Sequence, residues 1–439
     1  MANAPEETTA DLLRFLQRSP TPYHAVESAS SRLLAAGFQK LSLADSWRGL
    51  GPGGYVVSRE GTLIAFALPA GARVGSFALV GAHTDSPNLR LKPLAEITRH
   101  GYRQLGVEVY GGALLNSWLD RDLGLAGRAL VRGATGQPEA RLLQIDRPLV
   151  RVAQLAIHLD REVNERGLVL NRHEHLAPIF GESVKDATNL AQFCAAELGV
   201  AAGDVVGLEL MLYDVAAPSL GGVEREFVFS ARLDNLASCH AGVSALVDVG
   251  PKIALDRPLP VLVLFDHEEV GSQSAGGAAS SLLPSVLERV VLAREGSRED
   301  YHRALAASMC VSADMAHALH PNYADKHEAQ HQPKLNGGPV IKVNAQQRYA
   351  TQASTAARFA ELCRAEEVPV QYYVHRTDLP CGSTIGPIAA TVLGIPTVDV
   401  GNAMLSMHSA REMAGARDPW AMRRVLRRFF AQGAQFSSG

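Results

Sequence analysis

Short, mostly apolar runs alternate with amphipathic stretches in the part of the chain that follows Leu233. Runs of this length and composition are typical of buried strands in a parallel sheet that is covered on both faces. The stretches between them carry apolar residues at helical spacing, which predicts helices between the strands. The strand candidates are Val261–Phe265, Met309–Ala313, Val370–Val374 and Thr397–Val400, and the helix candidates are Ala237–Val249, Leu282–Arg294, Ser354–Glu366 and Pro419–Phe430.

The beginning of the chain, up to about Pro93, has the same character. Helical spacing runs over Glu7–Gly37 and is interrupted by a proline-containing turn at Ser19–Pro22. Two strand candidates follow, at Leu63–Leu68 and Phe77–Val80. The beginning and the end of the chain are therefore expected to form one domain.

The middle of the chain differs, because strand-like segments and turn signals recur there and helical signals are few. The strand candidates are Gly106–Tyr110, Arg128–Val131, Leu208–Tyr213 and Glu226–Phe229, and the clearest helix is Asn189–Leu198. We expect an α/β fold in which residues 1–92 and 233–439 form a discontinuous domain with a mostly parallel central sheet covered by helices. Residues 93–232 are expected to form an inserted β-rich domain.

Composition narrows the class of protein. The 439 residues are 47% hydrophobic and 20% charged, which is ordinary for a folded globular chain. The net charge of −3 gives no electrostatic footprint for nucleic acid, and no basic run suggests anionic lipid. The acidic N-terminus does not resemble a secretory signal, and no apolar run approaches the ~20 residues of a spanning helix. Five scattered cysteines, none in a C-x-x-C pair, favour a reducing compartment, so we expect a soluble cytoplasmic protein.

Residues that can bind metals recur at or just past the ends of apolar runs, where open α/β sheets bind their ligands. They are His83, Asp85, Asp234, Glu268, Glu269, Asp314 and His408. Taken singly, each is more often a structural residue than a ligand. Two metal ions that share one carboxylate need one histidine and one further carboxylate each, plus a free base, and the order His, Asp, Glu-Glu, Asp, His fits that count. Such ligands suit zinc, and also manganese or cobalt.

Long stretches of the chain resemble the aspartyl aminopeptidases, a family of co-catalytic di-zinc exopeptidases. The resemblance spans almost the whole length and shows no departure at the positions expected to carry chemistry. The matching stretches include HTDSPNLRLKP (His83–Pro93), GGALLNSWLDRDLGLAGR (Gly111–Arg128), AIHLDREVN (Ala156–Asn164), SARLDNLASC (Ser230–Cys239), FDHEEVGSQSAGGA (Phe265–Ala278), SADMAHALHPNY (Ser312–Tyr323), NGGPVIKVNAQQRYAT (Asn336–Thr351), PCGSTIGP (Pro380–Pro387) and VDVGNAMLSMHSARE (Val398–Glu412).

The resemblance implies a role for each candidate ligand. Asp234 would bridge two zinc ions, of which one also takes Glu269 and His408 and the other takes His83 and Asp314. Glu268 would be the general base, accepting a proton from the metal-bridging water and passing it to the leaving amine. Asp85 would accept the free imidazole N–H of His83, although a turn residue before Pro87 is the alternative reading.

The resemblance also implies a substrate and an assembly. The substrates would be peptides with N-terminal Asp, and also Glu, whose side-chain carboxylate meets Lys342 with Tyr349 nearby. Without the resemblance, Lys342 would be read as a lysine on an edge strand. His158 would enter the active site of a neighbouring subunit, the inserted domain would mediate dimerisation, and the dimers would form a tetrahedral dodecamer. No nucleic acid or membrane partner is expected.

Two other functions compete with this interpretation. One is a di-metal aminopeptidase or deacylase of neutral specificity, in which Lys342 would be unnecessary. The other is a non-catalytic assembly scaffold, in which a free base beside Glu269 would be unnecessary. Four further histidines, His317, His320, His327 and His331, could suggest another metal site. A structural role is the stronger reading for them, and no ligand role is implied by the resemblance.

Overall fold

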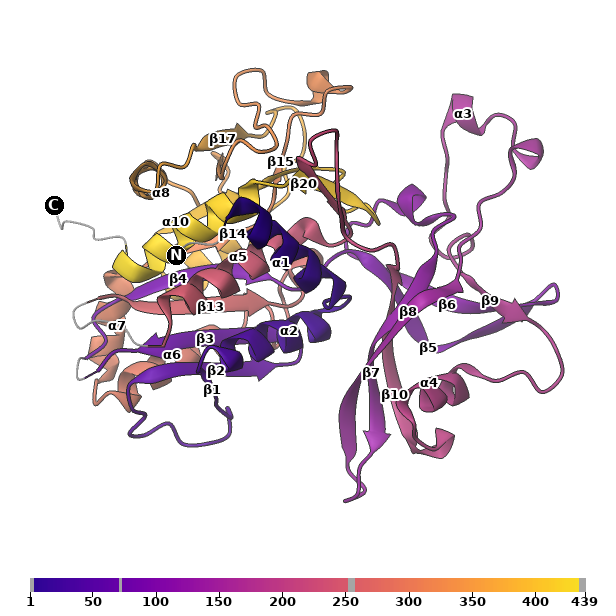
Figure 1. The fold of residues 1–439 in the computed structure, drawn as a ribbon, viewed down its shortest axis with the longest axis horizontal. Coiled ribbons are helices and arrows are strands. Elements are labelled where there is room, and N and C mark those ends of the chain that lie inside the picture. Colours follow the sequence, from indigo (N-terminus) through magenta and orange to yellow (C-terminus); the bar gives the residue numbers. More distant parts are fainter. Residues whose placement is uncertain (1–3, 71–72, 252–256, 434–439) are drawn as a thin grey trace.

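The computed structural model describes residues 4–70, 73–251 and 257–433, and the chain has two parts (Figure 1). One part holds a large sheet with helices packed on it and contains both the first and the last helix. The other is an extended, strand-rich part built from the middle of the chain. The helices within the described residues are α1 (Pro5–Gln17), α2 (Pro22–Ala35), α3 (Val163–Arg166), α4 (Leu190–Leu198), α5 (Leu233–Val249), α6 (Leu282–Ala293), α7 (Arg298–Ala306), α8 (Ala353–Ala365), α9 (Ile385–Leu393) and α10 (Asp418–Gln432).

The first part is built on a nine-stranded sheet whose centre is parallel. In order across the sheet, the strands are β1 (Gln39–Lys40), β2 (Gly53–Arg59), β3 (Thr62–Leu68), β13 (Leu259–Phe265), β4 (Phe77–His83), β14 (Met309–Ala313), β18 (Thr397–Gly401), β16 (Val340–Val343) and β17 (Gln371–Val374). Strand β4 pairs in parallel with β13 and β14, and β14 pairs in parallel with β18. Antiparallel pairs lie outside this centre, between β3 and β13 and between β16 and β18. The predicted α/β fold with a mostly parallel central sheet is confirmed.

Helices cover both faces of this sheet. Successive residues on a strand point to opposite sides, so alternate residues of β13 pack against different sets of helices. On β13, Leu262 and Leu264 join the apolar cluster formed with α1, α2, α5, α8 and α10. Val261, Val263 and Phe265 pack on the other side with α6, α7 and α9. Every residue of β3, β4 and β13 is buried, as expected for strands covered on both faces.

The strand-rich part contains an antiparallel six-stranded sheet with its own apolar core. Its strands, in order, are β8 (Pro138–Val150), β7 (Leu123–Arg132), β10 (Val205–Asp214), β5 (Asn88–Arg99), β6 (Tyr102–Tyr110) and β9 (Ile179–Glu182). Helix α4 contributes Leu190 and Cys194 to the core of this part. The helix begins with a capping box at Asn189, which explains why its start is visible in the sequence.

A five-stranded sheet joins the end of the middle segment to later parts of the chain. Its strands, in order, are β11 (Ser219–Gly221), β12 (Phe227–Ser230), β20 (Glu412–Gly415), β19 (Ala403–Leu405) and β15 (Ala316–His317). Strand β5 passes through residue 93, and β12 pairs with the C-terminal strand β20. The division at residues 93 and 232 therefore stays a prediction.

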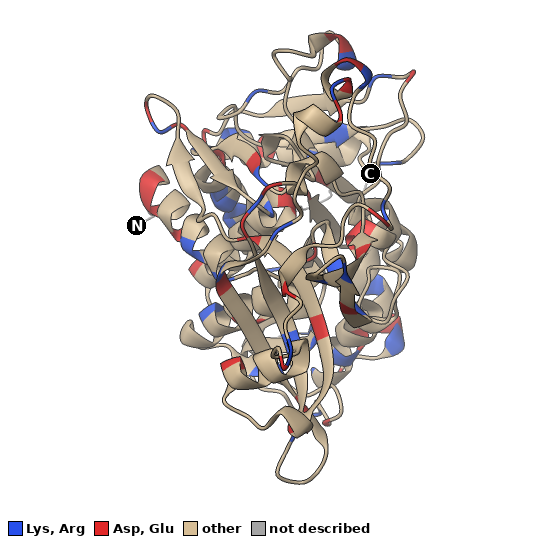
Figure 2. Cartoon of the chain, turned by 90° about the vertical axis from the view of Figure 1, so that its right-hand side faces the viewer, with Lys and Arg blue, Asp and Glu red and all other residues tan. Residues whose placement is uncertain are grey.

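The distribution of charged residues and the lengths of the helices bear on possible partners of the chain. Lys, Arg, Asp and Glu are interspersed over the ribbon in Figure 2. Among the described residues, no helix combines the length and the apolar character needed to cross a bilayer.

Candidate active site

The seven candidate residues converge where the central strands end. His83 ends β4, Asp314 follows β14 directly, and Glu268 and Glu269 begin the short helix η4 (Glu268–Val270) after β13. Asp234 lies in the first turn of α5, and His408 lies in the loop between β19 and β20. Because β13, β4 and β14 run in parallel, their carboxyl ends reach the same edge of the sheet.

The carboxylate of Asp234 lies between the two histidines. Its Oδ1 is 3.4 Å from Nε2 of His83, and its Oδ2 is 3.5 Å from Nε2 of His408. The same Nε2 of His83 is 3.5 Å from Oδ1 of Asp314, whereas Nε2 of His408 is 3.4 Å from Oε2 of Glu269. Each histidine therefore faces a carboxylate of its own, and both face Asp234.

Two groups of ligand atoms are close enough to hold a metal ion each. One consists of His83, Asp234 and Asp314, and the other of Asp234, Glu269 and His408; the ligand atoms within each group lie within 4.8 Å of one another. A third group, His83 with Glu268 and Glu269, overlaps both. Mixed histidine and carboxylate ligands are those that zinc takes in catalytic sites.

Backbone carbonyl groups orient both histidine rings. Nδ1 of His83 lies 3.0 Å from the carbonyl oxygen of Asp85, and Nδ1 of His408 lies 3.1 Å from that of Gly112. A carbonyl oxygen only accepts, so Nδ1 donates in each ring and Nε2 presents its lone pair to the cluster. Gly112 belongs to the segment after β6, so the middle of the chain contributes directly to this site.

The side chain of Asp85 holds the backbone of the neighbouring glutamates. The sequence predicts that this carboxylate accepts the N–H of His83, but at 3.4 Å its Oδ1 is farther from Nδ1 than the carbonyl of the same residue. Oδ1 also accepts the amide of Glu268 at 3.1 Å, and Oδ2 accepts the amide of Glu269 at 3.1 Å and the hydroxyl of Tyr110 at 2.6 Å. The predicted role of Asp85 beside His83 stays a prediction.

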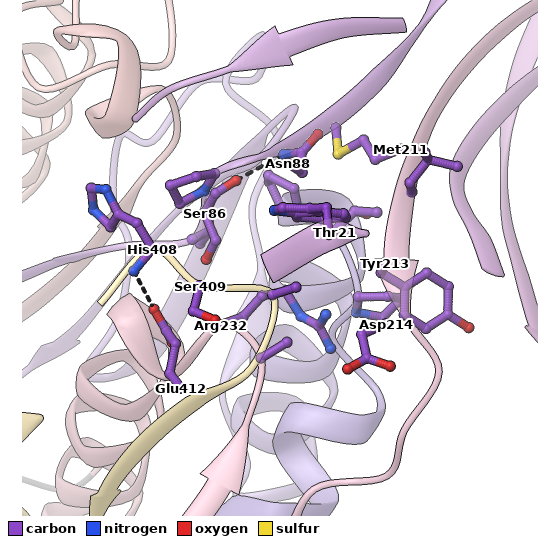
Figure 3. Close-up of a pocket in the computed structure, with 18 residues that line it drawn as sticks. Thr21, Ser86, Asn88, Met211, Tyr213, Asp214, Arg232, His408, Ser409 and Glu412 are labelled. Atoms are coloured by element: carbon purple, nitrogen blue, oxygen red, sulfur yellow. Dashed lines mark hydrogen bonds between the residues drawn. The ribbon is translucent and has the colours of Figure 1, made fainter. Parts of the chain in front are cut away.

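Glu412 is a buried carboxylate at the site that the sequence does not single out. Its Oε1 accepts the amide of His408 at 2.8 Å, a bond drawn in Figure 3, and its Oε2 accepts the amide of Asp234 at 3.2 Å. Burial and the charge of Asp234 raise the pKa of Glu412 to about 8. Its place at the end of LSMHSARE was the only available signal, because an acidic residue there has no spacing that distinguishes it from a surface residue.

The cluster holds more negative charge than its histidines balance. Oδ1 of Asp234 and Oε1 of Glu269 are buried and accept no hydrogen bond. Burial raises the pKa of Glu268 to about 8, with the charges of Asp314 and Asp85 acting in the same direction. Burial also raises the pKa of Glu269 well above its usual value. Free carboxylate oxygens that lack counter-charge fit a bound divalent cation.

An open cavity of about 460 Å³ lies beside the cluster. Two of the predicted substrate-binding residues, Lys342 and Tyr349, line this cavity. The buried Nζ of Lys342 donates to the carbonyl of Met315 at 3.1 Å, lies 3.5 Å from Oδ2 of Asp314, and sits 5.1 Å from the centre of the Tyr349 ring. Lys342 is thus a buried cation at the cavity wall rather than a lysine that reaches solvent.

The four further histidines do not form one site. His317 lines the cavity, and burial together with the nearby charge of Lys342 lowers its pKa to about 4. His327 accepts the amide of His320 at 3.1 Å. His331 pairs with a glutamate three residues before it. Within the described parts of the chain, none of them belongs to a group of potential metal ligands.

His158 lies away from the cavity of its own chain. It belongs to the exposed short helix η2 (Ile157–Leu159) in the strand-rich part. It is not among the residues that line the cavity. Its predicted entry into a neighbouring subunit stays a prediction.

Comparison with known proteins identifies relatives over nearly the whole length. The family model described as aminopeptidase I zinc metalloprotease (M18) matches residues 15–430. The probable M18 family aminopeptidase 2 of Streptomyces coelicolor is 51% identical over 422 residues, covering 95% of this chain and 96% of the relative. The protein of the same name from Mycobacterium tuberculosis is 47% identical over 429 residues, covering 97% and 98%.

Solved structures agree with these relatives. A chain in the cryo-EM structure of the Ape4 and Nbr1 complex matches with a TM-score of 0.92 at 39% identity, covering 97% of this chain and 86% of that chain. The crystal structure of prApe1 matches with a TM-score of 0.90 at 29% identity, covering 97% and 94%. Together with the family model, these matches show that the chain belongs to the M18 family of zinc metallo-aminopeptidases.

Proposed function

We propose that this chain is a two-zinc aminopeptidase that removes acidic residues, Asp and Glu, from the N-termini of peptides. The observation that carries the proposal is the position of Asp234, whose two oxygens face two separate histidine–carboxylate pairs. In this proposal Asp234 bridges the ions, His83 and Asp314 complete one site, and Glu269 and His408 complete the other. Manganese or cobalt could replace zinc, because the same ligands suit them.

Glu268 is the proposed general base. It lines the cavity and stands outside both histidine–aspartate ligand groups, so its carboxylate is available to a reacting molecule. Two bound zinc ions would lower the pKa of a water molecule and polarise the scissile carbonyl. Glu268 would accept the proton of the attacking water and pass it to the leaving amine.

Lys342 supports selectivity for acidic N-terminal residues. A buried ammonium group needs a counter-charge, and the nearest carboxylate, Asp314, is itself a proposed metal ligand. The side-chain carboxylate of a substrate in the cavity would supply that charge. A pocket for neutral side chains would gain nothing from burying a lysine at this position.

We further propose that the inserted segment, residues 93–232, mediates dimerisation and that the dimers assemble into a dodecamer. The mApe1 of S. cerevisiae, 29% identical with a TM-score of 0.83, forms a dodecamer. In this chain Leu155, Ile157 and Leu159 are exposed around His158, and apolar side chains gathered at one exposed site are typical of interfaces. His158 would reach the cavity of the partner in that assembly.

The proposed location is the cytoplasm. All five cysteines are free, and four of them are buried. Unpaired cysteines are typical of proteins in a reducing compartment.

The substrate assay that tests this function compares aspartyl and alanyl peptides. In Lys342→Ala, kcat/KM for the aspartyl peptide should fall about 10- to 100-fold, because hydrogen bonds to charged groups contribute about 1.5–3 kcal/mol. The rate for the alanyl peptide should change little. Lys334→Ala, which removes an exposed lysine of a nearby loop, is the control.

Chelation separates the competing functions in the same assay. Removing the metal should abolish cleavage of both peptides, and adding zinc should restore it. An unchanged aspartyl-to-alanyl ratio in Lys342→Ala would favour a neutral-specific enzyme. Failure of the metal-loaded protein to cleave either peptide would favour the assembly scaffold.

A further inference from the structure

We propose that Glu412 is a positioning residue for one of the two metal sites, the site formed by Asp234, Glu269 and His408. This inference rests on the proposed two-metal function. Glu412 touches no reacting group in the structure; it acts through the backbone of two ligands. Its loss should therefore weaken one metal site before the other.

The two residues whose amides Glu412 accepts, His408 and Asp234, do not have the backbone geometry of a regular helix or strand. His408 lies in a loop with a left-handed backbone, φ 68°, and Asp234 departs from helical geometry although it lies at the start of α5. Residues in such conformations persist only when surrounding contacts determine them. The carboxylate of Glu412, 3% exposed on β20, provides that contact for both residues at once.

The neighbouring site has a different support. The carbonyl of Asp85 orients the ring of His83. The side chain of Asp85 also accepts the amide of Glu269, so this ligand of the site supported by Glu412 has a further support of its own. Asp314 follows strand β14, and its amide bonds to the carbonyl of Val400 on β18. His83 and Asp314 belong only to the neighbouring site, and within the described residues neither of them shares a hydrogen bond with Glu412.

A carboxylate is required at this position because both of its oxygens accept N–H groups. Glutamine has nearly the same shape but offers only one acceptor oxygen, and its NH2 group would face the second backbone N–H. One of the two ligand residues would then lose its acceptor. Outer partners of metal ligands typically change metal affinity by about 10- to 100-fold when they are substituted.

The test is metal binding by Glu412→Gln, measured by zinc titration of the metal-free protein against a competing chelator. The wild type should bind two ions per chain, and the variant should bind the ion of the Asp234–Glu269–His408 site about 10- to 100-fold more weakly. The other ion should lose less affinity, because only Asp234 of its ligands bonds to Glu412. Cobalt substitution gives an independent measurement. As cobalt is removed by a chelator from Glu412→Gln, the absorption of one of the two bound ions should disappear at a lower chelator concentration than in the wild type. Catalytic activity is not needed for either measurement.

Asp418→Asn is the matched control. Asp418 is also a buried carboxylate with two amide donors, Asn336 at 2.8 Å and Gly338 at 2.9 Å, but those residues are not proposed ligands. This variant should bind both ions as the wild type does. An equal loss of metal affinity in Asp418→Asn would show a general effect on the fold and would overturn the inference.

Other outcomes separate this inference from the function on which it rests. If the wild type binds only one ion, the two-metal proposal itself fails. If the wild type binds two and Glu412→Gln binds both unchanged, only the role of Glu412 fails. Should Glu412→Gln not fold, Glu412→Asp serves instead, because its shorter side chain cannot reach both amides without moving Asp234 or His408. A Glu412→Asp protein that holds both ions like the wild type would also overturn the inference.

Discussion

At the scale of single residues, the buried carboxylates of the site fall into two groups. Asp234 and Glu269 each keep an oxygen that accepts no hydrogen bond. Asp85 and Glu412 instead use both oxygens as acceptors for backbone amides. An oxygen already engaged by N–H donors has less capacity to bind a cation, so hydrogen bonding separates the ligands from the residues that support them.

Glu268→Gln tests the role of the base. The variant should retain both metal ions but lose nearly all turnover, because an amide cannot accept the proton of the attacking water. Metal content and kcat are the two measurements. Glu269→Gln provides the contrast, since it should lose metal affinity as well. Near-normal kcat in a metal-replete Glu268→Gln protein would contradict the assignment.

At the scale of elements, the bend after β6 brings the middle of the chain against the metal ligands. Gly111 has a φ of +68°, and a Cβ atom there would lie 3.0 Å from Cβ of Glu269. At Gly112 a Cβ atom would lie 3.1 Å from Nδ1 of His408. Glycine is therefore needed at Gly111 both for its backbone conformation and for the close approach.

Gly111→Ala should weaken zinc binding and lower kcat/KM, because the added methyl group presses on Glu269. Gly199→Ala is a matched control: Gly199 also has a left-handed backbone, φ 66°, but its Cβ would meet nothing within 4 Å. That control should lose only about 1 kcal/mol of stability, the ordinary cost of alanine in this conformation. Equal zinc affinity in the two variants would show that the contact with Glu269 is unimportant.

At the scale of the whole molecule, the strand-rich part contacts the active site of its own chain and also carries a residue proposed to enter a neighbouring one. Within one chain it supplies Gly112 and Tyr110, which contact His408 and Asp85. It also carries His158 on an exposed segment that does not reach the cavity of the same chain. If His158 completes a neighbouring site, the catalytic unit is a dimer.

Mixed assemblies test that expectation. His158→Ala and Glu268→Gln should each be inactive alone. When the two chains are co-expressed with different tags and purified through both, activity should return, because one site per mixed dimer combines an intact Glu268 with the partner's intact His158. No recovery in doubly purified oligomers would place His158 outside the neighbouring site, and a monomer at micromolar concentration would contradict the assembly.

The order of residues along the chain is enough to predict most of the strands and helices and to find the residues that can bind a metal. Apolar runs such as Val261–Phe265 are strands because burial on both faces leaves a local signature, and β13 covers that run. His83, Asp314 and the Glu268–Glu269 pair stand at or just past the ends of such runs, so their place along the chain is visible in the sequence. Resemblance along the chain then indicated the family, which the comparisons confirm.

Which of these residues come into contact is visible only in the folded chain. The two oxygens of Asp234 face different histidines, Glu412 reaches two amides from β20, and His317 separates from the other loop histidines to line the cavity. Some of these contacts join residues that are far apart in sequence. Others depend on the direction in which a single side chain points. Local periodicity reports burial and secondary structure, whereas such contacts follow from how the sheets and loops pack together.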